Sequence, residues 1–310
     1  MRYSSSAKQP PRFGLFPRAI HRQAWFVNVR QAILKQTDTL AAVGIDSPRL
    51  DCELLLEHVL GKPRIEFYME PELILSKIEA RRFAGFVARR AKRVPLQHLV
   101  GTVSFCGLEI HVNRHVLIPR PETEQLAEEA IRVLVGVKRP RVLDFGTGSG
   151  CLALAIAVEN QEAQIDALDL SAKALDVAGS NARRHRVASR IRFLQGDGKQ
   201  GLPGRVWYHV IVANPPYIPS AEIDHLQPEV RDHDPRLALD GGNDGLEFYR
   251  ILAERSRSRL KLGGQLLLET GDDQAKDVKE LLTSKNWSVD NILPDLNGTS
   301  RIVIASLDEK

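Results

Sequence analysis

From residue 141 onward, short apolar runs alternate with amphipathic stretches of helical period. The runs with strand character lie near residues 141–145, 164–169, 190–195, 208–213, 265–270, 288–293 and 301–306. Alternating strands and helices are typical of a doubly wound α/β sheet. Pro294, Asn297 and Gly298 separate the last two strands, which follow a helix near residues 272–286, so we expect a terminal antiparallel hairpin. The pattern predicts an α/β fold with seven strands.

The chain before this region has a helical pattern from about Trp25 to Arg93. Ser47 and Pro48 predict an N-cap and the first residue of a helix that stops at Gly61. The apolar stripe of this helix is Leu50, Leu54, Leu55 and Val59. We therefore expect a small all-α domain over residues 24–95.

A second helix in this domain opens with a capping box formed by Ser76 and Glu79. The side chains that it is predicted to bury are Ile78, Phe83, Phe86 and Val87. Its basic end, residues 89–93, is predicted to be a solvated face, which suits the helix dipole. A patch facing phosphate or the ribosome is the alternative interpretation.

The period changes to that of strands after Pro95. The apolar positions around Gly107 predict a β-hairpin linker over residues 96–117, and they are Val103, Phe105, Leu108, Ile110 and Val112. Pro121 is the expected start of a helix through Val135, in a catalytic domain of residues 118–310. Arg120 and Glu124 at its start are second-rank site candidates, although Pro and Glu are also ordinary first-turn residues.

The apolar runs and the cysteines of the sequence indicate where the protein is located. No apolar run approaches the ~20 residues of a membrane span, so no membrane contact is expected. The cysteines Cys52, Cys106 and Cys151 are scattered, with no metal-ligand spacing. This pattern indicates reduced thiols in a cytoplasmic compartment, without a disulfide framework or a metal site.

The positive charge is concentrated at the N-terminus. Seven of the 43 basic residues lie in positions 1–37, where there is no acidic residue, so the rest carries 36 basic against 39 acidic side chains. That balance argues against a general nucleic-acid surface and against direct DNA binding. Residues 1–23 are expected to be a disordered basic head. We favour a plain tail or an upstream start codon, and a mitochondrial transit peptide is the alternative.

A strand that ends at Phe145 runs into a glycine-rich turn. The turn consists of Gly146, Thr147, Gly148, Ser149 and Gly150. Glycines at such a turn permit positive φ and close approach of a ligand to the backbone. A dinucleotide fingerprint would require glycine where Cys151 stands, and the spacing is instead G-x-G-x-G preceded by Asp144.

The next two strands also end in acidic residues. Asp169 could accept both hydroxyls of a ribose, or it could cap the following helix, for which Ser171 is available. Asp197 before Gly198 could accept an exocyclic amine of adenine, or it could be a simple turn residue. The three turns therefore predict a nucleoside site at one edge of the sheet.

The fourth strand ends in Asn214-Pro215-Pro216-Tyr217. Two prolines cannot continue a sheet, so the carbonyls here stay outside the ladder. The oxygen of Asn214 and the carbonyl of Pro215 could accept both N–H bonds of a planar amide, and Tyr217 could stack on it. A proline-rich loop without function is the alternative interpretation.

These turns resemble those of S-adenosylmethionine-dependent methyltransferases, and the Asn-Pro-Pro-Tyr motif resembles their amino-group branch. The chain is most similar to the release factor glutamine N5-methyltransferases, the HemK/PrmC family, over about residues 25–306. The stretches that carry this resemblance are Arg49-Leu50-Asp51, Glu53-Leu54-Leu55-Leu56, Leu117-Ile118-Pro119-Arg120-Pro121-Glu122-Thr123-Glu124 and Asp234-Pro235-Arg236-Leu237-Ala238-Leu239-Asp240-Gly241-Gly242.

The resemblance implies methyl transfer from S-adenosylmethionine to the glutamine side chain in the Gly-Gly-Gln motif of class I peptide release factors. It also implies a doubly wound methyltransferase sheet behind the helical, substrate-recognising domain. The implied cofactor residues are Gly146, Thr147, Gly148, Ser149, Gly150, Asp169, Asp197, Gly198 and Asn214. The implied substrate residues are Asn214, Pro215, Pro216 and Tyr217, with Asn214, Pro215 and Tyr217 catalytic. Gly198 replaces a bulkier side chain of some relatives, which affects the packing against the adenine.

Other functions share parts of this pattern. The same chemistry on a glutamine of a ribosomal protein is the nearest alternative, and adenine N6 methylation of a flipped base is a second. A binding module without catalysis and a nicotinamide oxidoreductase are disfavoured by the intact motif at Asn214 and by Cys151. We expect a monomer that needs no metal.

Overall fold

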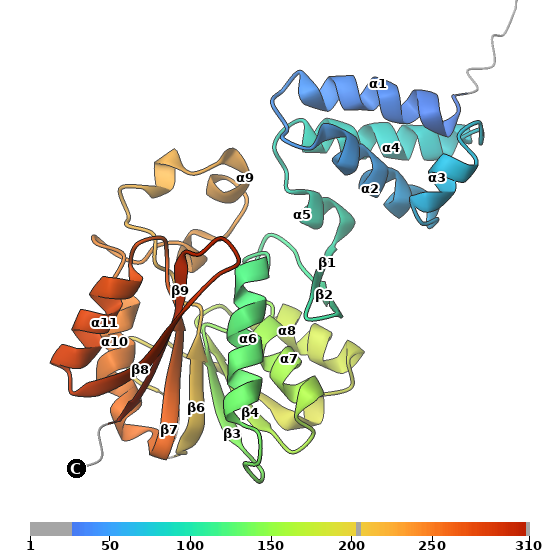
Figure 1. Cartoon of the computed structure of the whole chain (residues 1–310). Coiled ribbons are helices and arrows are strands. Elements are labelled where there is room, and N and C mark those ends of the chain that lie inside the picture. Colours follow the sequence, from blue (N-terminus) through green and yellow to red (C-terminus); the bar gives the residue numbers. More distant parts are fainter. Residues whose placement is uncertain (1–26, 203–205, 308–310) are drawn as a thin grey trace, which may run out of the picture.

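The computed structural model describes residues 27–202 and 206–307, and a single large sheet dominates it (Figure 1). Its strand order is β5-β4-β3-β6-β7-β9-β8. The strands are β3 Arg141–Phe145, β4 Gln164–Asp169, β5 Ile191–Gln195, β6 Tyr208–Ala213, β7 Leu260–Glu269, β8 Trp287–Pro294 and β9 Ser300–Leu307. The first five are parallel, whereas β9 is antiparallel to both β7 and β8. The predicted seven-stranded sheet with a terminal hairpin is confirmed.

Strand β7 starts at Leu260, earlier than the predicted residue 265. Gly263 and Gly264 interrupt its apolar pattern, and the pairing with β6 shifts register between Tyr208 and Val210. A β-bulge of this kind adds residues to a strand without adding apolar alternation, so the period alone misses it.

Helices cover both faces of the sheet, because successive strand residues point to opposite sides. On one face, Val210 and Val212 share a core with α6 Pro121–Val133, α7 Cys151–Glu159 and α8 Ala172–Arg184. On the other face, Ile211 and Ala213 pack with α10 Glu247–Arg255 and α11 Ala275–Ser284. Figure 1 shows these layers, with α6 and α7 on one side of the strands. The 3-10 helices are η1 Ala188–Arg190, η2 Ile223–His225, η3 Arg236–Ala238 and η4 Ser256–Ser258.

A helical domain with its own core precedes the sheet. Its helices are α1 Val29–Ala41, α2 Pro48–Leu60, α3 Ile65–Met69, α4 Lys77–Arg90 and α5 Leu96–Val100. The hairpin of β1 Thr102–Phe105 and β2 Leu108–His111 connects it to the sheet domain (Figure 1). Helix α5 therefore lies inside the predicted linker. None of the described helices has the length and apolar content needed to cross a membrane.

Several local predictions in the helical domain are confirmed. Gly61 ends α2 in the left-handed conformation at φ 64°, and Ser76 with Glu79 forms both bonds of a capping box. Ser47 is the N-cap residue and Pro48 the first residue of α2, as predicted, although the Ser47 side chain makes no capping hydrogen bond. Ile78 is 73% exposed, because it precedes the buried Phe83 by five residues, about 140° around the helix.

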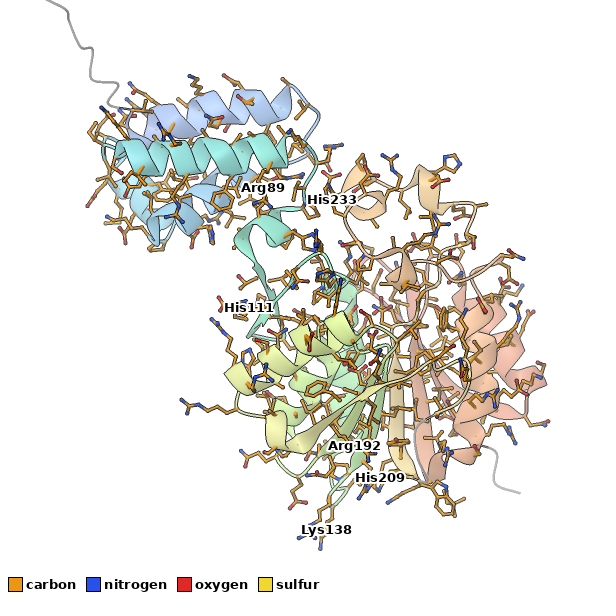
Figure 2. All side chains as sticks on the ribbon, turned by 180° about the vertical axis from the view of Figure 1, so that it is seen from behind. Arg89, His111, Lys138, Arg192, His209 and His233 are labelled. Atoms are coloured by element: carbon orange, nitrogen blue, oxygen red, sulfur yellow. The ribbon has the colours of Figure 1, made fainter. Side chains whose placement is uncertain are left out.

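The basic end of α4 is only partly the solvated face that the sequence predicts. Arg89 is exposed, but Arg90 is 8% exposed and its guanidinium binds Asp51 at 2.6 Å. The same guanidinium reaches Glu229 at 2.9 Å, on α9 Pro228–Arg231 of the sheet domain. Figure 2 labels Arg89 and His233 on the two sides of this junction. Arg90 is thus a buried tie between two parts of the chain.

Candidate functional site

A cavity of about 900 Å³ opens at the carboxyl ends of the parallel strands. Strand β3 lies between β4 and β6, so the sheet reverses its order there. In open α/β sheets ligands bind at this switch point. The predicted site residues that line the cavity are Gly146, Gly148, Asp169, Asp197, Gly198, Asn214 and Pro216.

The glycine-rich turn between β3 and α7 has the conformation that its residues were expected to permit. Gly146, Gly148 and Gly150 have φ of 74°, 55° and 83°. A Cβ at Gly150 would lie 2.9 Å from Leu154 and 3.0 Å from the Cβ of Ala178, so glycine also allows α7 to approach α8.

Thr147 and Ser149 of this turn face the interior. Thr147 is 4% exposed and Ser149 is 2% exposed, and neither lines the cavity. The hydroxyl of Thr147 donates to Asp144 at 2.6 Å, and the carbonyl of Ser149 accepts from Asn181 at 2.9 Å. These two residues hold the turn from behind, whereas Gly146 and Gly148 face the cavity.

Asp169 at the end of β4 is held by two backbone amides. Its Oδ2 accepts from the amide of Gly148 at 2.9 Å, and its Oδ1 accepts from that of Ser171 at 2.8 Å. Burial raises the pKa of Asp169, and these hydrogen bonds oppose that effect. Ser171 caps α8 with its own side chain, so Asp169 is not needed as the cap. Its carboxylate is therefore fixed beside the cavity with further acceptor capacity.

The turn after β5 brings Asp197 to the cavity as well, and its Oδ1 accepts from the amide of Lys199 at 2.9 Å. A Cβ at Gly198 would lie 2.2 Å from Cε2 of Phe145. The ring of Phe145 lines the cavity and so occupies the space that a side chain at residue 198 would take.

Asn214 and Pro216 extend the cavity wall from the end of β6, but Pro215 and Tyr217 do not line it. The Nδ2 of Asn214 donates to the hydroxyl of Thr123 at 3.0 Å. Burial raises the pKa of Tyr217 to about 12, and its carbonyl accepts from Gln274 at 2.9 Å. The motif thus divides into two residues that face the cavity and two that pack behind it.

Two residues behind Asn214 were not among the sequence candidates. Thr123 at the start of α6 is 2% exposed, and Glu269 at the end of β7 is 1% exposed. Burial raises the pKa of Glu269 to about 7, and the neighbouring polar groups of Thr123 and Asn214 oppose that effect. The signal for Glu269 was its place at the carboxyl end of a strand that neighbours β6.

The second-rank candidates lie outside the cavity lining. Arg120 binds Asp234 at 3.0 Å, and the following residues, Pro235 to Asp240, contribute to the cavity wall. The carboxylate of Glu124 accepts from the backbone amide of Cys106 in the hairpin at 2.9 Å. Both side chains therefore hold neighbouring segments in place.

The sequence of this chain is similar to family models and to known proteins. Residues 31–101 match the PrmC N-terminal domain, and residues 126–229 match the methyltransferase small domain. The release factor glutamine methyltransferase of Geobacter sulfurreducens is 41% identical over 267 residues, covering 85% of this chain and 91% of its own. That of Coxiella burnetii is 40% identical over 279 residues, covering 90% and 99%.

Among solved structures, the hMettl16 catalytic domain superposes with a TM-score of 0.51 at 16% identity, covering 72% of this chain and 82% of its own. At this identity the likeness shows the fold alone. The two relatives above match this chain over nearly their whole length. The chain belongs to the release factor glutamine methyltransferase family.

Proposed function

We propose that this protein transfers a methyl group from S-adenosylmethionine to the side-chain amide nitrogen of the glutamine in the Gly-Gly-Gln motif of class I peptide release factors. The observation that carries this proposal is the position of Asn214 and Pro216 on the wall of a cavity that also exposes Gly146, Gly148 and Asp169. The residues proposed to bind a nucleoside and those proposed to bind an amide therefore line the same cavity.

The residues of the cavity fit S-adenosylmethionine by their chemistry. Asp169 offers a fixed carboxylate for the ribose hydroxyls, and Asp197 offers an acceptor for the adenine amine. Phe145 and Leu168 supply apolar surface for the base. The positive φ of Gly146 and Gly148 brings bare backbone to the cavity wall, where a bulky side chain would exclude the ligand. When bound, the cofactor supplies a methyl group on an electron-poor sulfonium.

The chain's contribution to the reaction is orientation. A carboxamide nitrogen is a weak nucleophile, because its lone pair is delocalised into the carbonyl. In this proposal the Oδ1 of Asn214 on the cavity wall and the carbonyl of Pro215 directly behind it accept the two N–H bonds of the glutamine amide. Tyr217, which packs behind the same wall, presents its ring to the plane of the amide. Positioning of this kind lowers the barrier by roughly several kcal/mol. The Nδ2 of Asn214 is occupied by Thr123, which leaves its oxygen as the free end.

The remaining parts of the proposal concern partners. We propose that the protein works as a monomer, without direct DNA contact, and that the helical domain helps to hold the release factor. An ion pair connects that domain to the cavity, since Arg90 binds Glu229 in the segment that leads to the cavity wall at Pro235.

Mass spectrometry of a release factor incubated with this protein and S-adenosylmethionine tests the function. We expect one methyl group on the Gly-Gly-Gln peptide. Asn214→Ala should abolish turnover while cofactor affinity changes little, and near-normal turnover of this variant would refute the assignment. Parallel incubations with ribosomal proteins and with DNA identify the alternative substrates, and methylation of either one in place of the release factor would overturn the proposal.

A further inference from the structure

A terminal carboxamide has a donor end and an acceptor end, so its function depends on which end faces the ligand. Asn214 directs its Nδ2 at the Thr123 hydroxyl, 3.0 Å away and away from the cavity. Thr123 lies 91 residues earlier in the chain, at the start of α6. Two elements that are distant in sequence therefore decide the orientation of one side chain.

The Thr123 hydroxyl has one hydrogen left once its oxygen has accepted the bond from Asn214. Glu269 is the neighbouring acceptor, and it interacts with both Thr123 and Asn214. Leu268, the residue before it, is paired with Ala213, the residue before Asn214, so the two side chains leave adjacent strands at the same level. A carboxylate can only accept hydrogen bonds. It therefore favours the donor end of Asn214 on its own side.

Burial disfavours the charge of Glu269 at this place. It is 1% exposed, and its Oε2 has no hydrogen-bond partner within the described chain. Leaving such a buried acceptor unsatisfied costs roughly 1–3 kcal/mol. A leucine would fill the same space without that cost. A buried carboxylate beside Thr123 and Asn214 is the kind of group expected where orientation matters more than stability.

We propose that Glu269 and Thr123 are positioning residues that hold the acceptor end of Asn214 toward the cavity and thereby select an amide over a carboxylate. This inference rests on the proposed function of the site. A glutamine presents two N–H donors to the Asn214 oxygen and the Pro215 carbonyl. A glutamate presents oxygens to the same two acceptors, so no hydrogen bonds form and binding of glutamate is disfavoured.

The charge on Glu269 depends on the groups around it. They come from α6, α7, the segment after β6, α10 and β9, and they are Glu122, Cys151, Tyr217, Tyr249 and Arg301. Arg301 lowers the pKa of Glu269 and Glu122 raises it, while burial is the largest effect and raises it to about 7. The carboxylate form of Glu269 is thus gained as pH rises through about 7.

Thr123→Val is the first test, because it removes the acceptor for Asn214 and keeps the shape of the side chain. We expect kcat with the release factor to fall about 10- to 100-fold, as for a misplaced catalytic group. Affinity for S-adenosylmethionine, measured by calorimetry, should change less than about 2-fold, and Thr123→Ser should restore most of the rate. Thr270→Val is the matched control, since that buried hydroxyl donates to the carbonyl of Arg301 instead.

The amide protons of Asn214 give a readout that does not depend on turnover. In the wild type, hydrogen exchange at Nδ2 measured by NMR should be slow, and in Thr123→Val it should be fast. Unchanged exchange, or a kcat equal to that of Thr270→Val, would overturn the inference. If the wild type does not methylate the release factor, the proposed function has failed instead, so the two failures are distinguishable.

Glu269→Gln tests the carboxylate itself. The wild-type kcat should rise with pH through about 7, and this rise should be absent in Glu269→Gln, whose activity is lower at every pH. A structural role alone would lower the rate without changing the shape of the pH profile. A profile with the same inflection in both proteins would contradict the role of Glu269.

Discussion

Gly198→Ala is expected to weaken cofactor binding through Phe145. The added Cβ would lie 2.2 Å from Cε2 and 2.4 Å from Cζ of that ring, whereas carbon atoms in contact are about 3.5–4.0 Å apart. The ring edge must therefore retreat by more than about 1 Å. Phe145 is 4% exposed and stacks edge-on with Phe248 at a centroid distance of 6.3 Å, so it has little space to move.

The size of this effect follows from the cost of overpacking. Forcing an extra carbon into a filled site costs about 1–3 kcal/mol. If the ring moves into the cavity, that cost falls on cofactor binding, and Kd for S-adenosylmethionine should rise between about 5-fold and about 150-fold. The backbone of Gly198 has no positive φ, so the conflict with Phe145 is steric and does not come from backbone strain.

Calorimetric titration of S-adenosylmethionine into Gly198→Ala, Phe145→Leu and the double variant measures the coupling directly. The smaller leucine makes room for the new methyl group, so the double variant should bind better than Gly198→Ala alone. Additive effects of the two substitutions would refute the reasoning, because independent sites do not share a steric conflict.

Three further predictions concern stability. Arg90→Met leaves the buried Asp51 carboxylate unpaired and removes the nearer of the two cations at Glu229, which keeps Arg93 at 3.4 Å, and should cost about 3 kcal/mol in denaturant unfolding. The exposed Arg89→Met should cost almost nothing, and equal costs would contradict this role of Arg90. Gly150→Ala should lower Tm more than Gly146→Ala, because both have positive φ but only the first meets neighbouring atoms within 4 Å; the reverse order would refute this. Burial raises the pKa of Asp144 from 3.8 to about 7, so the free energy of unfolding should fall as pH rises between these values. Denaturant unfolding of Asp144→Asn should show no such fall. The same pH dependence in both proteins would refute Asp144 as its cause.

The sheet was predictable because its strands are buried on both faces. Val210, Ile211, Val212 and Ala213 form a continuous apolar run, and such runs between glycine and proline signals are read directly from sequence. Parallel strands also place their carboxyl ends at one edge. That rule alone brought Asp169 and Asn214 to the same cavity.

Residues whose roles depend on distant partners were not predictable in the same way. Arg90 occupies a basic run that is solvated in most helices, but here it pairs with Asp51 on α2 and with Glu229 from the sheet domain. Thr123 lies within the stretch Leu117–Glu124 that resembles the family, but its contact with Asn214 depends on how α6 packs against β6. Periodicity describes one element at a time and contains no information on such contacts.

Gly198 shows how a single departure from a family pattern can be misread without the structure. From sequence, a missing side chain suggests a lost contact with the adenine. In the structure Phe145 from β3 fills the same space, so the apolar surface is supplied by a different element. Glycine at residue 198 leaves the space that the Phe145 ring fills, so the effect of either residue on the cavity depends on the other.

The segment between β6 and α10 connects the cavity with the helical domain. Glu229 at one end binds Arg90, and Asp234 a few residues later binds Arg120 at the start of α6. The chain between these ties and Asp240 lines the cavity, and Ile218 pairs with Asp240 to close it against the motif. Because the two ion pairs fix this wall from separate domains, a shift of the helical domain would reach the cavity through Glu229.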